Sequence, residues 1–254
     1  MRLVSLVPSL TETLFALGIE DSELIGRTSW CVHPADRVAS VRKLGGTKTP
    51  NVQRIIELEP DLVVLEREEN PKPVWEQLVA AGIETYVAHV CSVDDVAPML
   101  VDLGQAVGRG ASGHVLAEAV RREQGLCVEP SRRPVAVPLI WHDPLMAVAP
   151  TRYAGDLVRS VGFDVPDVEP GVGYPQVTPR RIGEVGTEVL MLTSEPHDFT
   201  VEEGDAVADE VAAAGFARPE PMKVDGEALT WFGARTASAI RSWRRVLEAT
   251  LPQP

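Results

Sequence analysis

The side chains best suited to binding chemistry lie in short loops that follow apolar runs of the sequence. Three of the five Trp residues are in such loops, in the stretches TSWCVHP, WHDPLM and LTWFGAR. A loop Trp beside Pro, Gly or His more often faces a pocket than a core. We therefore expect Trp30, Trp141 and Trp231 to contact a ligand, although packing in a partly buried position is the alternative for each.

Polar side chains accompany these aromatic groups. Four of them lie in comparable loops and are candidate ligand contacts: Ser9, His33, His142 and Tyr174. Arg235 stands near the start of the last predicted helix, where a cation is unfavourable for the helix dipole. An anionic or carbonyl-bearing ligand would explain this position, and so would a salt bridge to a neighbouring acid.

Three carboxylates follow an apolar run in the stretch LEREEN. Glu66, Glu68 and Glu69 repel one another unless they are solvated, paired or bound to a metal. A solvated rim is the favoured interpretation, and a metal site is the alternative. Because the run ends at a predicted strand end, Glu66 is also a candidate ligand contact.

Recognised catalytic motifs are absent from the sequence. It contains no P-loop, G-x-S-x-G or H-E-x-x-H pattern, which favours binding over catalysis. The alternative is an enzyme that uses Glu66, His142 or Cys31 as acid or base. Cys31 with His33, His142 and His197 could form a transition-metal site, but no recognised ligand spacing joins them. We therefore assign no metal ligand.

The elements that must position these loops occur twice. Residues 51–70 (NVQRIIELEPDLVVLEREEN) and 177–198 (VTPRRIGEVGTEVLMLTSEPHD) each combine a short helical pattern with an apolar run. Two further stretches indicate a strand, a loop and an amphipathic helix that closes at Gly18 or Gly162. A helix that leads into a buried parallel strand is the simplest interpretation. Ligands of such sheets bind outside the carboxyl ends of the strands.

Residues 92 to 124 show helical spacing without a strand pattern, which predicts one long helix or two helices in line. The chain is therefore predicted to have three parts: an N-terminal α/β lobe over residues 1–91, a bridging helical segment over 92–128 and a C-terminal α/β lobe over 129–254. Such lobes would have parallel-type sheets and a ligand cleft between them.

Composition excludes several classes of function. The net charge of -13 argues against a nucleic-acid-binding surface, and no stretch reaches the ~18 apolar residues of a membrane span. The cysteines Cys31, Cys91 and Cys127 lack C-x-x-C pairing and indicate reduced thiols. The start RLVSLV lacks a signal-peptide pattern. We therefore expect a cytoplasmic protein, or a periplasmic or lipid-anchored one if this is a processed start.

Nearly the whole chain resembles a known family. The stretches that carry the resemblance are, in order, RLVSLVPSLTETLFALG, TSWCVHP, GGTKTPN, IIELEPDLVVL, WHDPLMAVAPTRYAGDLVRSVG, GYPQVTPRRI and WFGARTASAI. They resemble the helical-backbone (class III) substrate-binding proteins of ABC importers, most of all the members that bind cobalamin, vitamin B12. The resemblance implies two Rossmann-like lobes bridged by a long helix, which hold one ligand without catalysis.

The resemblance also implies site residues and partners. Trp30, Trp231 and Arg235 match ligand-contacting positions, and Trp141 and Tyr174 lie in matching loops. Relatives of the cobalamin binders bind ferric siderophores and haem, so the ligand is expected to be a corrinoid, a tetrapyrrole or a metal chelate, with no covalent cofactor.

The chain lacks aromatic side chains at two positions where the family pattern has them. Cobalamin binders of the family carry aromatic side chains where this chain has Thr47 to Thr49 and Glu66. The smaller stacking area favours a smaller, more polar ligand or a metal complex.

Family members dock exposed Glu residues onto Arg of the permease, a role that Glu68 and Glu69 could fill in an exported protein.

Overall fold

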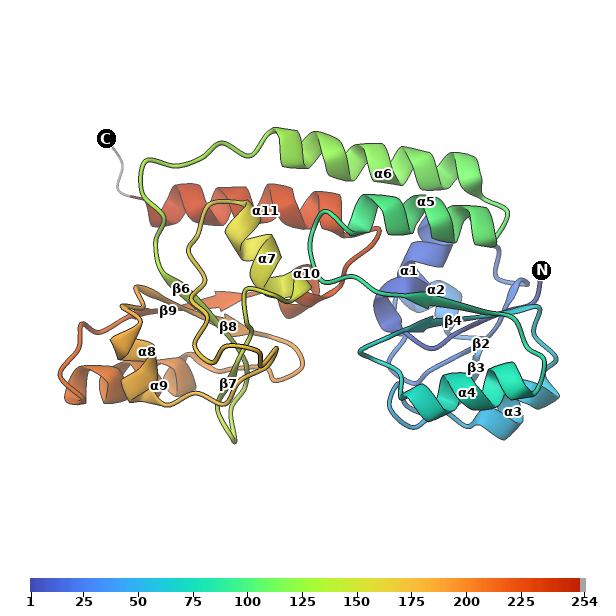
Figure 1. Cartoon of the computed structure of the whole chain (residues 1–254), viewed down its shortest axis with the longest axis horizontal. Helices are drawn as coiled ribbons and strands as arrows, with labels where there is room; N and C mark the ends of the chain where they lie inside the picture. Colours follow the sequence, from blue (N-terminus) through green and yellow to red (C-terminus); the bar gives the residue numbers. More distant parts are fainter. Residues whose placement is uncertain (252–254) are drawn as a thin grey trace. The chain divides into compact units, whose positions relative to one another are not determined.

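The computed structural model describes residues 1–251, which form two compact units (Figure 1). Unit 1 comprises Met1–Val90, Asp94–Arg121 and Trp231–Arg235. Unit 2 comprises Cys91–Val93, Arg122–Thr230 and the described chain from Thr236 onward. Each unit has its own sheet with helices packed on it, so the predicted α/β class with two lobes is confirmed. The predicted three-part division of the chain stays a prediction.

Unit 1 is built on a five-stranded parallel sheet. Its strands are β1 (Leu3–Ser5), β2 (Leu24–Arg27), β3 (Arg42–Lys43), β4 (Leu62–Glu66) and β5 (Thr85–Ala88). They lie in the order β3-β2-β1-β4-β5. The chain leaves β1 towards one edge and later returns to β4 beside it, so the loops after β1 and β4 diverge. Open α/β sheets bind ligands at such a point.

Helices cover both faces of this sheet. On one face lie α3 (Val52–Glu57) and α4 (Lys72–Ala80), whose buried side chains form a cluster with the strands (Figure 1). The cluster contains Ile55, Val74 and Leu78 from the helices and Val4, Leu6, Val63 and Leu65 from the region of β1 and β4. The other face carries α1 (Pro8–Ala16), and α2 (Ala35–Val38) is a single short turn.

Unit 2 has a four-stranded mixed sheet. Its strands are β6 (Ala136–Trp141), β7 (Met146–Ala147), β8 (Val189–Thr193) and β9 (Glu220–Val224), in the order β7-β6-β8-β9. β6, β8 and β9 are parallel, whereas β7 turns back beside β6 in the antiparallel direction. The antiparallel β7 was not predicted, because its pairing to β6 involves only two residues of the loop region after the apolar run.

The helices of unit 2 also lie on both faces of its sheet (Figure 1). On one face are α8 (Pro179–Glu184) and α9 (Val201–Ala213), which bury Ile182, Val207 and Val211 against β6 and β8. The remaining helices are α7 (Tyr153–Ser160), α10 (Gly226–Thr230) and α11 (Thr236–Thr250).

The predicted repeat is confirmed by equivalent helix caps and buried strands in the two units. In unit 1 the side chain of Asn51 accepts a hydrogen bond from the Arg54 amide, at 3.0 Å, and caps α3. In unit 2 the Thr178 hydroxyl accepts from the Arg181 amide, at 3.2 Å, and caps α8. Each helix then leads into a strand that is buried along its whole length, β4 or β8, as the paired sequence patterns predicted.

An acidic side chain fixes the first strand of each sheet in the same way. Asp61 accepts from the Arg2 amide at 2.6 Å, and Glu188 accepts from the Val135 amide at 3.1 Å. The amides of Asp61 and Glu188 donate back to the carbonyls of Arg2 and Val135, both at 2.8 Å. The same hydrogen-bond pattern therefore occurs in both units, just before the first strand of each sheet.

The segment predicted as a long helix forms two helices, α5 (Val96–Ala106) and α6 (Gly110–Gly125). The expectation of helices in line was wrong, because Gly108 adopts a φ of +69° and the chain folds back. A Cβ on Gly104 would lie 2.9 Å from the Cα of Gly113, so the two helices touch through glycine backbone. α6 contributes residues up to Arg121 to unit 1 and its last turn to unit 2.

Candidate ligand-binding site

Three predicted contacts lie at the carboxyl edge of the sheet in unit 1. Ser9 follows β1, Trp30 follows β2 and Glu66 is the last residue of β4. Because these strands are parallel, the three residues share one edge of the sheet. They differ in access: Trp30 is 66% exposed, whereas Ser9 and Glu66 are buried. Trp30 is therefore the side chain of the three that a ligand could stack on.

The stretch LTWFGAR begins in α10 rather than after a strand, and its residues 231–235 return to unit 1. Trp231 is buried, with its ring centroid 5.6 Å from that of His33. The guanidinium carbon of Arg235 lies 4.8 Å from the Trp231 ring centroid, and its Nε donates to Glu12 at 2.5 Å. The salt-bridge explanation for Arg235 is confirmed, and Trp231 packs within the unit.

Glu66 departs from the solvated rim predicted for the acidic stretch. Its side chain is 3% exposed, and its Oε2 accepts from the amides of Glu68 and Glu69, at 2.6 and 2.7 Å. Burial raises the pKa of Glu66 to about 7, against the opposing effect of the two amide hydrogen bonds. The carboxylate therefore shapes its own turn, and Glu68 and Glu69 remain on the surface side of it.

Asn70 joins this turn to the rest of the edge and was missed in the sequence. Its Oδ1 accepts from the Glu66 amide at 2.9 Å, and its Nδ2 donates to the carbonyls of Leu6 and Thr47, at 3.2 and 3.0 Å. Unit 2 has a counterpart, because the Thr193 hydroxyl donates to the Leu139 carbonyl at 2.9 Å. No local spacing identifies Asn70, since the carbonyls to which it donates, those of Leu6 and Thr47, are 64 and 23 positions away in the chain.

In unit 2 the loops after β6 and β8 bring aromatic rings together. The rings of His142 and His197 are stacked at 5.6 Å, and Trp141 meets His197 edge-on at 6.0 Å. Phe199 closes the group at 4.7 Å from His197. Glu203 lies 3.2 Å from Nε2 of His197 and 3.9 Å from Nδ1 of His142. Trp141 is 42% exposed, so this cluster is open to a ligand.

Sequence reasoning missed Phe199 and Glu203 as members of this cluster. A signal for Glu203 was present, because Thr200 and Glu203 form a capping box at the start of α9. The backbone amide of Thr200 donates to Glu203 at 2.8 Å, so the carboxylate is fixed in place beside the histidines. Its pKa is lowered, chiefly by this backbone hydrogen bond, and it stays an anion in the neutral pH range.

Tyr174 lies in the loop between α7 and α8 rather than after a strand. That loop runs beside β7, with the amides of Ala147 and Ala149 donating to Pro175 and Gly173, both at 3.0 Å. Tyr174 is 43% exposed, and the Arg152 guanidinium carbon lies 5.8 Å from its ring centroid. Tyr174 is thus a second accessible aromatic side chain in unit 2.

The residues proposed for metal binding or acid–base chemistry are divided between the two units. His33 belongs to unit 1, and His142 and His197 belong to unit 2. Cys31 is fully buried, its thiol contacts the Thr28 hydroxyl at 3.1 Å, and burial raises its pKa, so it is poorly placed to act as a base. Within residues 1–251, no three His, Cys, Asp or Glu side chains are grouped so that they could hold a metal ion.

Comparison with known proteins identifies the family. A family model described as periplasmic binding protein matches residues 3–214. The chain belongs to this family. A vitamin B12-binding protein of Yersinia pseudotuberculosis serotype O:3 (strain YPIII) is 25% identical to this periplasmic binding protein over 198 residues, which cover 76% of this chain and 69% of the relative.

Solved structures share the fold of this periplasmic binding protein. The periplasmic vitamin B12-binding protein of Vibrio cholerae has a TM-score of 0.82 at 18% identity, covering 99% of this chain and 98% of the other. The periplasmic haem-binding protein of Roseiflexus sp. RS-1, in its apo form, has a TM-score of 0.81 at 20% identity, covering 98% of both chains. At these identities the likeness concerns the fold.

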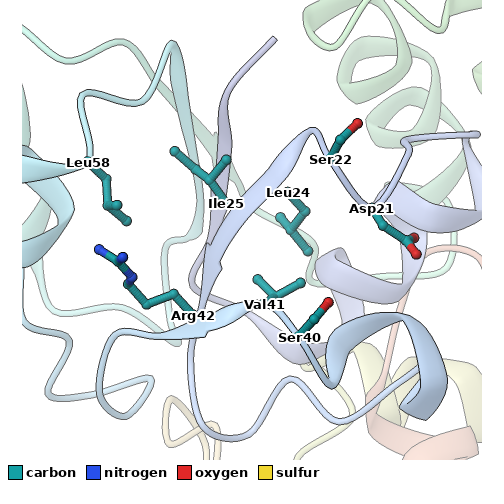
Figure 2. A pocket seen from close by; sticks show the side chains of 8 residues that line it. All are labelled: Asp21, Ser22, Leu24, Ile25, Ser40, Val41, Arg42 and Leu58. Carbon is teal, nitrogen blue, oxygen red and sulfur yellow. The ribbon is translucent and has the colours of Figure 1, made fainter.

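Unit 1 also has a cavity that lies away from the carboxyl edge of its sheet. It has a volume of about 330 Å³ and opens at the opposite, amino edge of the unit 1 sheet, where β2 and β3 begin (Figure 2). It is lined by Asp21, Ser22, Leu24, Ile25, Ser40, Val41, Arg42 and Leu58. The cavity contains none of the predicted ligand contacts.

No helix in the described part of the chain combines the length and the apolar character needed to span a bilayer.

Proposed function

We propose that this chain binds a metal chelate of the corrinoid, tetrapyrrole or siderophore-like class without catalysis. Proteins of the same family or fold are named for binding vitamin B12 or haem. Their ligands are large macrocycles that present a flat face, which aromatic side chains bind by stacking. A cofactor held covalently is not part of the proposal, since the ligand is the cargo.

The observation that carries the proposal is the ring cluster of Trp141, His142, His197 and Phe199 in unit 2. The rings of Trp141, His142 and His197 lie at the carboxyl edge of β6 and β8 with centroids 5.6 to 6.0 Å apart, and the buried Phe199 packs beneath them at 4.7 Å from His197. Rigid aromatic surfaces bind flat ligands at low conformational cost. The exposed imidazole of His142 would add a donor for a metal centre or a polar substituent.

The ligand is expected to be smaller or more polar than intact cobalamin. The turn from Thr47 to Thr49 and Glu66 stand where the family resemblance implies aromatic side chains, and neither supplies a ring for stacking; Thr47 and Glu66 are also buried, at 8% and 3% exposed. Among the predicted ligand contacts, the accessible aromatic side chains are Trp30 in unit 1 and Trp141 and Tyr174 in unit 2. Of these, Trp30 is the most exposed and the most suited to a contact that forms only with ligand present.

Titration tests the ligand class. Purified protein is titrated with cyanocobalamin, haemin and a ferric hydroxamate, with binding followed by absorbance and calorimetry. At least one should bind below about 100 µM, which corresponds to about -5.5 kcal/mol. Replacing Trp141 by Ala should weaken that binding about tenfold, equivalent to about 1.4 kcal/mol.

Trp75 provides the matched control. It is 37% exposed on α4, and its indole donates to the Thr85 hydroxyl at 3.2 Å, away from the carboxyl edge. Trp75→Ala should leave affinity unchanged. Absence of binding for all three compounds contradicts the proposed ligand class, and equal losses for the two Trp variants contradict the proposed site.

We further infer that Glu68 and Glu69 dock onto a permease if the protein is exported. Glu69 is exposed, and Lys48 fixes the turn by donating to the Glu68 carbonyl at 2.6 Å, with its Nζ 3.7 Å from Glu69. Reversal of both charges, Glu68→Lys with Glu69→Lys, should abolish transport in cells that express the permease and leave ligand affinity intact. Normal transport by this variant contradicts the docking role.

A further inference from the structure

The carboxylate of Glu66 has one oxygen that the protein holds and one that it does not. Oε2 accepts from the amides of Glu68 and Glu69, at 2.6 and 2.7 Å. Oε1 accepts no hydrogen bond from residues 1–251, and the nearby cation Lys48 pairs with Glu69 instead, at 3.7 Å. The side chain is 3% exposed, but Oε1 is not among the fully buried polar atoms that lack a partner, so it keeps contact with solvent. The carboxyl edge of β4 therefore presents an oriented acceptor.

Contacts connect this acceptor to the loop against which the exposed Trp30 lies. A Cβ on Gly46 would lie 3.7 Å from Nε1 of Trp30, so the indole is beside the loop between β3 and α3. The next residue of that loop, Thr47, accepts from Nδ2 of Asn70 at 3.0 Å. Oδ1 of Asn70 in turn accepts from the Glu66 amide at 2.9 Å. A macrocycle that stacks on Trp30 can therefore extend over Glu66 within the same unit.

The turn that contains Glu66 is acidic. Its three carboxylates, on Glu66, Glu68 and Glu69, are accompanied by two cations, Arg67 in the turn and Lys48 in the loop after β3. Burial raises the pKa of Glu66 to about 7, against the opposing effect of the two amide hydrogen bonds. At pH 8 the carboxylate is therefore mainly ionised.

An oriented carboxylate oxygen discriminates between the polar groups of a ligand. A ligand amide can donate to it, which replaces the hydrogen bond to water that the bound ligand excludes. A ligand carboxylate at the same place has no proton to donate at pH 8 and brings two like charges together, at a cost in free energy. Corrinoids carry carboxamide side chains around the ring, whereas haem carries propionates.

We propose that Glu66 is a specificity-determining residue that selects a corrinoid with carboxamide side chains over a macrocycle with carboxylate side chains. Its Oε1 accepts a hydrogen bond from a ligand amide while Trp30 contacts the ring. The inference rests on the proposed function, because it names the member of the chelate class that the site takes. It also gives a role to an acid at a position where the family resemblance implies an aromatic side chain.

Two corrinoids that differ only in the polar groups around the ring test the proposal. Dicyanocobinamide carries carboxamides, and dicyanocobyrinic acid carries carboxylates around the same ring and metal. Both are titrated into the full chain at pH 8, with binding followed by absorbance and calorimetry. The wild type should bind dicyanocobinamide at least about tenfold more tightly, equivalent to about 1.4 kcal/mol.

Glu66→Gln should change the two affinities in opposite directions. Its side-chain oxygen can take the place of Oε2, which two amides hold, so its NH2 group takes the place of Oε1. Dicyanocobinamide should bind about threefold more weakly, because a hydrogen bond to a charged acceptor is lost. Dicyanocobyrinic acid should bind about tenfold more tightly, because a donor replaces a like charge. Damage to the turn would weaken both.

Glu57→Gln is the matched control, since it removes one exposed acid of unit 1 from α3. The ratio of the two affinities should be the same in this variant as in the wild type. Two outcomes overturn the proposal: wild-type protein that binds dicyanocobyrinic acid as tightly as dicyanocobinamide, or a ratio that Glu66→Gln leaves unchanged.

The wild type alone decides if Glu66→Gln does not fold. Both titrations are then repeated in about 1 M sodium chloride, where a Debye length of about 3 Å screens the distant charges of the chain. A preference for dicyanocobinamide that persists supports direct contact, and its loss overturns the proposal. Binding of haemin without binding of dicyanocobinamide overturns the role of Glu66 and still supports the proposed function. Absence of binding for every chelate contradicts both.

Discussion

The buried carboxyl of Glu66 makes the stability of the protein depend on pH. Its pKa rises from 4.5 to about 7 on folding, because burial disfavours the charged form. For an acid with a raised folded-state pKa, the cost is absent below 4.5 and complete above 7. Between pH 4.5 and pH 8 the free energy of unfolding of the wild type should therefore fall by about 3 kcal/mol relative to Glu66→Gln.

Urea unfolding of both proteins across this pH range measures that difference. Other titrating groups contribute equally to the two proteins and cancel in the comparison. Parallel stability curves would show that Glu66 ionises without cost in the folded protein and would contradict its burial.

Glu59 adopts the left-handed backbone conformation, which glycine adopts more readily than residues with a Cβ. Its φ is +44°, and in the paired copy of the repeat the equivalent position is Gly186, with a φ of +73°. The left-handed conformation costs a residue with a Cβ about 1–2 kcal/mol, partly offset by the greater freedom of glycine in the unfolded chain. Glu59→Gly should therefore raise the free energy of unfolding by about 0.5–1 kcal/mol.

Gly186→Ala is the matched change in unit 2. A Cβ there meets nothing within 4 Å, so any effect comes from the backbone alone. It should lower the free energy of unfolding by about 1 kcal/mol in urea titration. Stabilisation by Gly186→Ala, or loss of stability in Glu59→Gly, would contradict the structural equivalence of the two positions.

At the scale of elements, the contact between α5 and α6 depends on glycine. A Cβ on Gly113 would lie 2.6 Å from the carbonyl oxygen of Leu100, a distance that forces the helices apart. Gly113→Ala should lower the free energy of unfolding by about 1–3 kcal/mol, as overpacking does in a core. Gly110→Ala, where the nearest atom is a flexible Gln105 side chain at 3.8 Å, should be neutral or slightly stabilising. Similar losses in both variants would indicate helix propensity rather than packing.

The repeated helix and strand could be predicted because both of their periodicities are visible in the sequence. β4 and β8 are continuous apolar runs, and the capping residues Asn51 and Thr178 mark the helices before them. β9 could not be predicted in this way, since Glu220–Val224 is half-exposed, contains Pro221 and Lys223, and pairs on one side only. Its position depends on β8, which the local sequence does not show.

The exposure of a side chain in the candidate site could be predicted where that side chain follows an apolar run. It could not be predicted where contacts with distant parts of the chain determine the exposure. Trp30 and Trp141 are exposed at strand ends, as expected from their loops. Trp231 is buried because it follows α10 and packs with His33 and Arg235. His33 lies about 200 positions before Trp231 in the chain, so no local pattern could distinguish this Trp from the others.

At the scale of the whole molecule, the net charge of -13 opposes compactness. Salt screens repulsion between charges that are farther apart than about 8 Å at physiological ionic strength. Raising sodium chloride from 10 to 150 mM should therefore raise the unfolding midpoint, by about 2–4 °C for each kcal/mol of repulsion removed. Calorimetry measures this shift, and choline chloride should reproduce it. A midpoint that falls with salt would show that attractive ion pairs outweigh the repulsion.

The return of residues 231–235 to unit 1 sets the order in which the protein is completed during translation. Thr13, in α1, accepts the Ala234 amide at 3.0 Å, and Glu12 pairs with Arg235. These partners lie 221 and 223 positions apart in the chain, so they leave the ribosome at widely separated times. Unit 1 therefore stays incomplete until the segment of unit 2 from Arg122 to Thr230 has been made.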